Sequence, residues 1–257
     1  MKNDKINLLL TISYCGSAYC GWQIQPNKKT IEGELENVLS KLFNEKITVV
    51  GSGRTDAGVH ALKAKANVIL PKDFTLKNFY DEKEKFNKLI NVLNNFLPDD
   101  IVIKSIKKVP INFNARKSAK RKTYIYKVKL SRKSPFDANR FYFLNESLNV
   151  SHMQKCANVL LGEHDFSSFC ASKTSVTSFV RTIYSIKIKQ SKNVVSFEIC
   201  GNGFLYNMVR IIVGTLIEFS LKNIDENEMK KVLNGKNRNL AGKTAPACGL
   251  YLKNVVY

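Results

Sequence analysis

Residues 51–61 read Gly-Ser-Gly-Arg-Thr-Asp-Ala-Gly-Val-His-Ala, which places one acid beside one guanidinium in a loop flanked by glycines. Apolar residues at 47–50 lead into this loop, and a β-like stretch at 64–70 follows it. The pattern predicts a strand–loop–strand frame that holds the carboxylate of Asp56 at the mouth of a cleft. Glycine and aspartate are also common turn residues, so the loop taken alone is more typical of a structural turn than of a catalytic site.

The order of residues argues against two phosphate-binding loops. A dinucleotide-binding fingerprint needs its third glycine where Asp56 stands. A P-loop ends in Gly-Lys-Ser/Thr, whereas Val59 follows Gly58 in this chain. The acid would also repel a phosphate group.

The charge of the chain indicates a polyanionic partner. The 257 residues include 41 Lys and Arg against 21 Asp and Glu, which gives a formal net charge of +20. Such an excess favours nucleic acid as the partner, the alternative being a composition that is simply rich in lysine. We expect no membrane span, because Arg210 and Glu218 interrupt the most apolar stretch, 208–219, well short of the roughly 18 residues required.

The cysteines and histidines predict neither a metal site nor a disulfide framework. The six cysteines form no Cys-x-x-Cys pair, and the chain has only three histidines. His164 and Asp165 are therefore interpreted as structural residues. Scattered thiols in a chain of this length fit a reducing compartment, and we expect a cytoplasmic protein.

Hydrophobic periodicity predicts an α+β fold in two similar halves, 1–109 and 110–257, in which antiparallel strands are flanked by helices. Thr30 is the expected N-cap of the first helix, and Pro98 and Gly162 are expected to end the second and third. The expected strands are 6–14, 64–70, 101–109, 123–130, 183–188, 194–200 and 250–255; the expected helices are 31–43, 86–97, 151–161, 204–219 and 226–233.

Six sequence blocks follow one another in a set order: residues 14–25, 53–61, 113–126, 162–166, 204–210 and 241–250. On these blocks the chain resembles the TruA family of tRNA pseudouridine synthases over nearly its whole length. The resemblance implies a pseudouridine synthase-like fold with a basic cleft between the two halves. It also implies isomerisation of uridine to pseudouridine, a reaction that needs no metal and no small-molecule cofactor.

The resemblance assigns roles to four residues. It implies that Asp56 is the catalytic carboxylate and that Arg210 is its counter-charge, which keeps the pKa of the acid low. The target base must leave its stack before it reacts, so Arg54 is expected to fill the vacated space and Tyr124 to stack on the uracil. Read without the resemblance, Tyr124 fits a core aromatic of a strand and Arg210 fits an arginine whose charged end reaches solvent.

Further residues are expected to contact RNA. A basic run at 120–122, interleaved with aromatic residues, suits phosphate contacts, although it also suits a solvated face. The remaining residues expected to bind substrate are Phe113, Arg116, Arg132, Lys173, Thr174 and Ser175.

The implied partner is the anticodon stem-loop of tRNA, with modification at tRNA positions 38–40, and the implied assembly is a homodimer. Two alternatives stay open: a paralogue that modifies rRNA by the same chemistry, and a non-catalytic RNA-binding or RNA-folding protein on the same scaffold. The chain departs from the family pattern at Cys15, Cys20 and Lys117, in the extra length of 81–85, and at 63–67, which is polar where a Gln-Val-type strand is typical.

Overall fold

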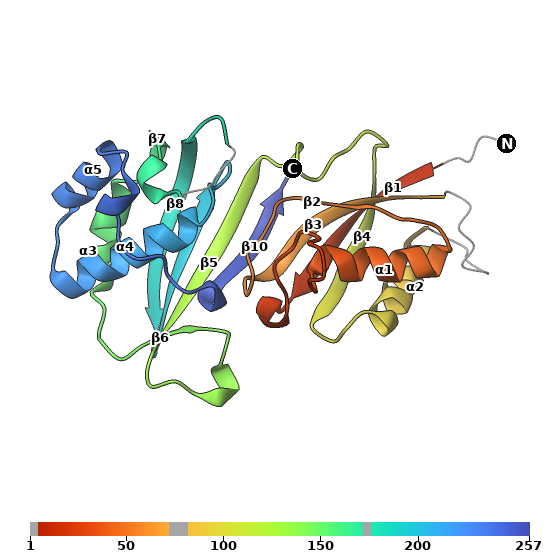
Figure 1. The fold of residues 1–257 in the computed structure, drawn as a ribbon, viewed down its shortest axis with the longest axis horizontal. Helices are drawn as coiled ribbons and strands as arrows, with labels where there is room; N and C mark the ends of the chain where they lie inside the picture. The colour runs from red at the N-terminus through yellow and green to blue at the C-terminus, as the bar shows by residue number, and fades with distance from the viewer. Residues whose placement is uncertain (1–4, 72–81, 172–175) are drawn as a thin grey trace. The chain divides into compact units, whose positions relative to one another are not determined.

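The structure is a computed structural model that describes residues 5–71, 82–171 and 176–257. Its contacts divide the chain into two compact units. Unit 1 runs to Ala119 and includes Leu252–Tyr257, and unit 2 is Lys120–Tyr251. Both units combine largely antiparallel strands with helices, so the predicted mixed fold is confirmed (Figure 1).

Unit 1 contains a sheet in the order β4-β1-β3-β10, with β2 also paired to β3. β1 lies antiparallel between β3 and β4, so that Leu8 stands opposite Val68 and Thr11 opposite both Lys65 and Ser105. Its strands are β1 (Lys5–Tyr14), β2 (Val49–Gly51), β3 (His60–Pro71), β4 (Ile101–Val109) and β10 (Leu250–Val256), whose last residues belong to this unit.

Two helices cover one face of this sheet, α1 (Ile31–Phe43) and α2 (Glu82–Phe96) (Figure 1). The predicted cap of α1 is confirmed, because the Thr30 hydroxyl accepts a hydrogen bond from the Gly33 amide. Alternate residues of β1 supply the buried core under the helices, among them Leu8, Leu10 and Ile12. The intervening residues of β1 lie on the other face of the sheet.

Unit 2 contains the strands β5, β9, β8 and β7 in that order, and neighbouring strands among them are antiparallel. The short β6 adds to β5 in parallel. The predicted hairpin is confirmed as β8 and β9, whereas β6 and β7 were not predicted. The strands are β5 (Arg121–Leu130), β6 (Tyr142–Leu144), β7 (Gly162–Asp165), β8 (Val180–Ser191) and β9 (Val194–Gly201).

The helices of unit 2 are α3 (Val150–Asn158), α4 (Met208–Lys222) and α5 (Glu226–Asn234). Two predicted boundaries were wrong. α3 ends at Asn158 because the amides of residues 159–161 bond three residues back in tight turns, and Gly162, with φ +98°, opens β7 instead of ending the helix. α4 begins at Met208 and not at Phe204, because Asn207 has φ +60° and cannot continue a right-handed helix backwards.

Two asparagines hold the segment after β4 against unit 1. The Asn7 amide donates to the carbonyls of Pro110, Ile111 and Phe113 at 2.9–3.2 Å. Asn67 donates to Asn7 Oδ1 and accepts from the Ala115 amide. Residues 110–119 therefore belong to unit 1, ten residues beyond the boundary expected at 109. The division into halves 1–109 and 110–257 as domains stays a prediction.

Replacing Asn7 with Leu should destabilise the protein by about 2–4 kcal/mol, because three backbone carbonyls then lose their donor and the buried Asn67 amide loses its acceptor. The side chain is 1% exposed. Urea unfolding measures the change. The matched control is Asn112→Leu at an exposed position of the same segment, which should shift the free energy of unfolding by less than about 0.5 kcal/mol. Equal stability of the two variants would contradict the role given to Asn7.

Candidate functional site

The loop of residues 51–61 connects β2 to β3 as predicted. The Ser52 amide bonds to the Lys65 carbonyl at the base of the loop, and the Val59 amide bonds to the Asp56 carbonyl in a tight turn at its tip. Gly58 takes φ +78° within that turn, a conformation that suits glycine. Asp56 is half-buried and Arg54 is exposed, so the loop presents both charged groups at its outer side.

A second backbone segment, residues 14–22, lies directly against this loop. The Trp22 amide donates to the Thr55 carbonyl at 3.0 Å, and the Gly58 amide donates to the Tyr19 carbonyl at 3.4 Å. A Cβ atom on Gly16 would stand 1.9 Å from the Val59 carbonyl oxygen, and one on Gly21 would stand 2.5 Å from the Thr55 carbonyl oxygen. Only glycine allows this approach, which explains why both glycines belong to the first sequence block.

Buried polar side chains fix the loop from beneath. The Tyr14 hydroxyl and Thr55 Oγ1 are hydrogen-bonded at 2.8 Å in the core. The Gly16 amide donates to His60 Nδ1, so that ring nitrogen carries a lone pair. With Thr55 turned inward, its neighbours in sequence, Arg54 and Asp56, are left on the outer side. The position of Asp56 thus depends on contacts made by the residues around it.

Trp22 links the segment to α1. Its indole donates to one carboxylate oxygen of Glu32, and the Ile24 amide donates to the other. Gly51 lies against the indole, where a Cβ would stand 2.5 Å from the ring. The sequence analysis did not assign a role to Glu32. The only signal was an acid in the first turn of a helix that begins soon after a tryptophan.

Tyr124 and Arg210 belong to unit 2. Tyr124 stands on β5 opposite Ile199, and its half-buried ring meets the edge of the Phe204 ring at 5.2 Å between centroids. Arg210 lies in the first turn of α4 and is also half-buried. Its Nε donates to the Ala245 carbonyl and its guanidinium donates to Asn207 Oδ1, both at 2.7 Å.

The same Asn207 whose φ angle delays the start of α4 therefore orients the arginine. Sequence analysis missed this residue, for which the pattern Asn-x-x-Arg at a helix start was the available signal.

The last sequence block, 241–250, packs against α4 and β5. The Gly242 amide donates to Thr215 Oγ1, and the Lys243 carbonyl lies where a Cβ on Gly214 would be 1.8 Å away. The Tyr126 hydroxyl donates to the Pro246 carbonyl, and burial raises the pKa of this phenol well above its usual range, which keeps the donor protonated. The blocks 204–210 and 241–250, together with Tyr126, thus form one packed arrangement around Arg210.

The other predicted contacts are spread over both units. Phe113 packs edge-on against Tyr257 in unit 1, with 4.9 Å between ring centroids. Arg116 is exposed one turn beyond it, and Arg132 is exposed after β5 in unit 2. Lys173, Thr174 and Ser175 lie outside the described residues.

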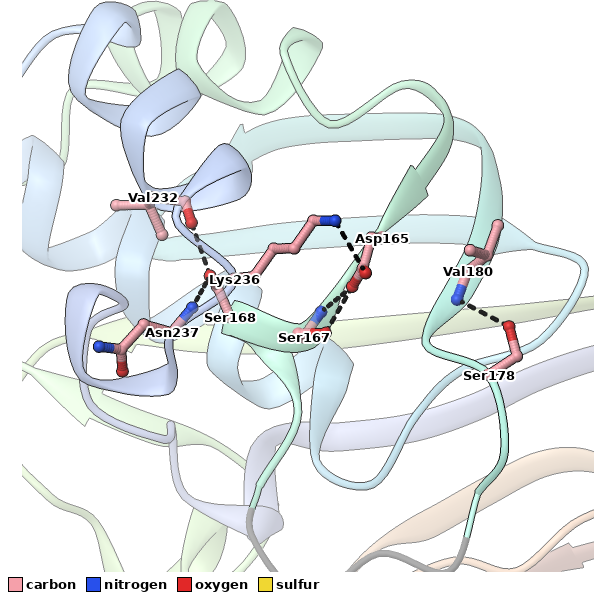
Figure 2. Close-up of polar contacts among 8 residues, drawn as sticks. All are labelled: Asp165, Ser167, Ser168, Ser178, Val180, Val232, Lys236 and Asn237. Carbon is pink, nitrogen blue, oxygen red and sulfur yellow. Dashed lines mark hydrogen bonds and ion pairs between the residues drawn. The ribbon is translucent and has the colours of Figure 1, made fainter.

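His164 and Asp165 make contacts within unit 2. His164 Nε2 bonds to the Leu161 carbonyl. Figure 2 shows Asp165 with Ser167 and Lys236, and the hydroxyl of Ser167 lowers the pKa of the Asp165 carboxyl. The neighbouring Ser168 bonds the Val232 carbonyl and the Asn237 amide, which ties this segment to α5 and the turn after it (Figure 2).

Across the described ranges, no three His, Cys, Asp or Glu side chains are grouped so that they could hold a metal ion. In the same ranges no helix has the length and apolar character needed to cross a membrane.

Comparison with known proteins adds independent information. A family profile described as tRNA pseudouridine synthase matches residues 10–116 and 156–257. A tRNA pseudouridine synthase A from Ruminiclostridium cellulolyticum is 45% identical over 250 residues, which cover 96% of this chain and 98% of the relative. One from Clostridium acetobutylicum is 40% identical over 263 residues, covering 100% of both chains. One from Thermoanaerobacter sp. is 42% identical over 253 residues, covering 98% of this chain and 99% of the relative.

Replacing Gly16 with Ala should push the Val59 carbonyl, and with it the loop of Asp56, out of place. We expect a loss of about 3 kcal/mol in the free energy of unfolding, since backbone cannot yield as a side chain does. Thermal or urea unfolding measures it. Gly203→Ala is the control, because the nearest atom to its added Cβ is 3.8 Å away. A Gly16→Ala protein as stable as this control would rule out the close approach of the two segments.

Proposed function

The chain belongs to the tRNA pseudouridine synthase family, and we propose that it isomerises uridine to pseudouridine in tRNA with Asp56 as the catalytic carboxylate. The observation that carries the proposal is the family match, which spans 10–116 and so includes the loop in which Asp56 is held by its neighbours. A carboxylate fixed by the backbone around it is pre-organised for chemistry, because little reorganisation is needed when the reaction occurs.

The reaction breaks the bond between N1 of uracil and C1′ of ribose and joins C1′ to C5 of the turned base. Atoms and electrons balance within the nucleotide once the proton on C5 is transferred to N1, so no oxidant or energy source is consumed. Asp56 can act in two ways: by attack on the sugar or the base, or by stabilising positive charge at C1′ while assisting the proton transfer.

Arg210 is proposed as the counter-charge of Asp56. Its guanidinium is oriented by the Ala245 carbonyl and Asn207, which fixes the plane of the fork. A guanidinium that is already oriented stabilises the ionised carboxylate with a smaller loss of side-chain entropy than a mobile guanidinium does. Tyr124 is proposed to stack on the flipped uracil, and its T-shaped contact with Phe204 limits rotation of the ring.

The finer assignments rest on the family resemblance and the charge of the chain. We propose that the target lies in the anticodon stem-loop at tRNA positions 38–40, and that Phe113, Arg116, Arg132 and the segment of Lys173, Thr174 and Ser175 contact the RNA. The exposed Arg116 and Arg132 suit phosphate contacts. A homodimer acting in the cytoplasm is part of the same proposal.

Asp56→Asn should reduce pseudouridine formation in a uridine-containing tRNA transcript by roughly 10²–10⁴-fold, because the amide can neither attack nor take a proton. Mapping of pseudouridine over time gives the rate. Asp99→Asn, an exposed change of the same kind, serves as the control and should keep the wild-type rate. Normal turnover by Asp56→Asn would contradict the role of Asp56 as the catalytic carboxylate, whereas absence of turnover by the wild type would favour the non-catalytic alternative.

Arg54→Ala should lower the rate constant at saturating tRNA by about tenfold or more while changing the Kd by less than about threefold. The reason is that the arginine fills the space left by the flipped base only after the tRNA has bound. Arg116→Ala should do the reverse and weaken binding, as a phosphate contact does. Single-turnover kinetics and filter binding separate the two quantities. An unchanged rate constant for Arg54→Ala would refute its role in base flipping.

A further inference from the structure

Thr11 is the centre of a polar cluster on the helix-free face of the unit 1 sheet. Lys65 Nζ donates to Thr11 Oγ1 at 2.7 Å, and Ser105 Oγ donates to the same oxygen at 2.8 Å. The register explains the meeting, because Lys65 on β3 and Ser105 on β4 both stand directly opposite Thr11 on β1. This face is opposite α1, since Tyr14, on the other set of β1 residues, packs on Trp22, which bonds to α1.

Two further lysines flank this centre. Lys107 on β4 stands opposite Leu9, one position along the same face, and Lys63 lies two residues before Lys65 on β3. Both are exposed, and Lys65 is half-buried. Burial lowers the pKa of Lys65, and repulsion from Lys107 and Lys63 lowers it further. Among the residues that the structure describes, none of these three lysines forms an ion pair with a carboxylate.

The cluster holds more hydrogen-bond donors than acceptors. An ammonium group has three N–H bonds, and Lys65 directs one of them at Thr11. The hydrogen bond between Ser105 and Thr11 uses the hydrogen of one of the two hydroxyl groups. The hydrogen of the other hydroxyl group remains available to donate. Thr11 is only 7% exposed, so its oxygen holds Lys65 and Ser105 in place from beneath. The ligand that suits such a cluster is an anion with several acceptor oxygens.

We propose that Thr11, Lys63, Lys65, Ser105 and Lys107, the Lys65 cluster, form a phosphate-binding site for the backbone of the substrate RNA, outside the site around Asp56. Lysine binds phosphate as a compact point charge, and hydroxyl groups complete the contacts. The RNA source rests on the proposed function. A second copy docked here across a two-fold axis would bring this cluster of lysines against its own counterpart, which does not suit a protein interface.

The cluster is a feature of this chain beyond the family resemblance. Lys63 and Lys65 fall in the stretch of residues 63–67 that departs from the Gln-Val-type strand typical of the family. The departure therefore adds two cations to one sheet face without touching the catalytic loop. We infer that it strengthens the hold on RNA and leaves the chemistry as it is.

The first test changes the exposed lysines only, so that the fold is kept. The double variant Lys63→Gln/Lys107→Gln should weaken tRNA binding about tenfold near physiological salt and reduce the slope of log K against log salt by roughly one to two. The matched control is Lys41→Gln/Lys46→Gln, which removes the same charge at exposed positions of α1 and of the segment after it. An equal effect of both variants, or none from the first, overturns the proposal.

The second test reads Lys65 directly in the wild-type protein. Its lowered pKa leaves more neutral amine, so it should react with acetic anhydride faster than the exposed Lys46, as measured by mass spectrometry. Addition of tRNA should protect Lys65 and Lys107 but not Lys46. Protection by inorganic phosphate without protection by tRNA overturns RNA as the source of the phosphate, and protection by neither overturns the site.

Failure of this inference and failure of the proposed function give different results. If the wild type forms pseudouridine in tRNA while the lysine double variant binds tRNA like its control, only the Lys65 cluster falls. If tRNA protects the cluster but no pseudouridine forms, the site stands and the enzymatic assignment falls.

Discussion

The close approach of two backbone segments, residues 16–22 and 55–59, is the constraint on which the placement of Asp56 depends. Carbonyl oxygens of Thr55 and Val59 occupy the space where side chains would stand on Gly21 and Gly16. Because the contact is between backbones, it holds the loop without using its polar side chains. The acid and the arginine at positions 56 and 54 stand on the outer side of the loop, because the buried Tyr14–Thr55 hydrogen bond sets which side faces inward.

A comparable arrangement in unit 2 uses a different device. Asn207 adopts a left-handed conformation that begins α4, and its side chain takes up the guanidinium of Arg210. The Ala245 carbonyl supplies the second acceptor, and the Ala245 amide returns a bond to the Arg210 carbonyl. A cation within an apolar helix is thus tolerated, because the Ala245 carbonyl and the Asn207 side chain accept its hydrogen bonds. Burying the charge without such acceptors would cost free energy.

Much of the fold was predictable from the sequence because strands and helices with one apolar face carry their own periodicity. The predicted first helix and its Thr30 cap, the β8–β9 hairpin and the strand at 101–109 were all confirmed. The end of α3 depends on the tight turns of residues 159–161, and the start of α4 depends on the φ angle of Asn207. The three residues of β6 are too few to show a period. The loop of Asp56 was recognised from its residues, but its supports were not. Tyr14 and Thr55 are 41 residues apart, and Asn7 and Phe113 are 106 apart, so only the strand register brings them together.

The last strand has a consequence for how the protein is made. β10 begins in unit 2 and ends in unit 1, where residues 252–256 lie beside β3 and the Tyr257 hydroxyl bonds to the Ala115 carbonyl. On the ribosome, residues up to 119 therefore emerge with one strand of their sheet still unsynthesised and with the part of the β3 edge that β2 does not cover exposed. Unit 1 is translated first, but its sheet is completed last. All of unit 2 must therefore be synthesised between the first folding of unit 1 and the addition of its final strand.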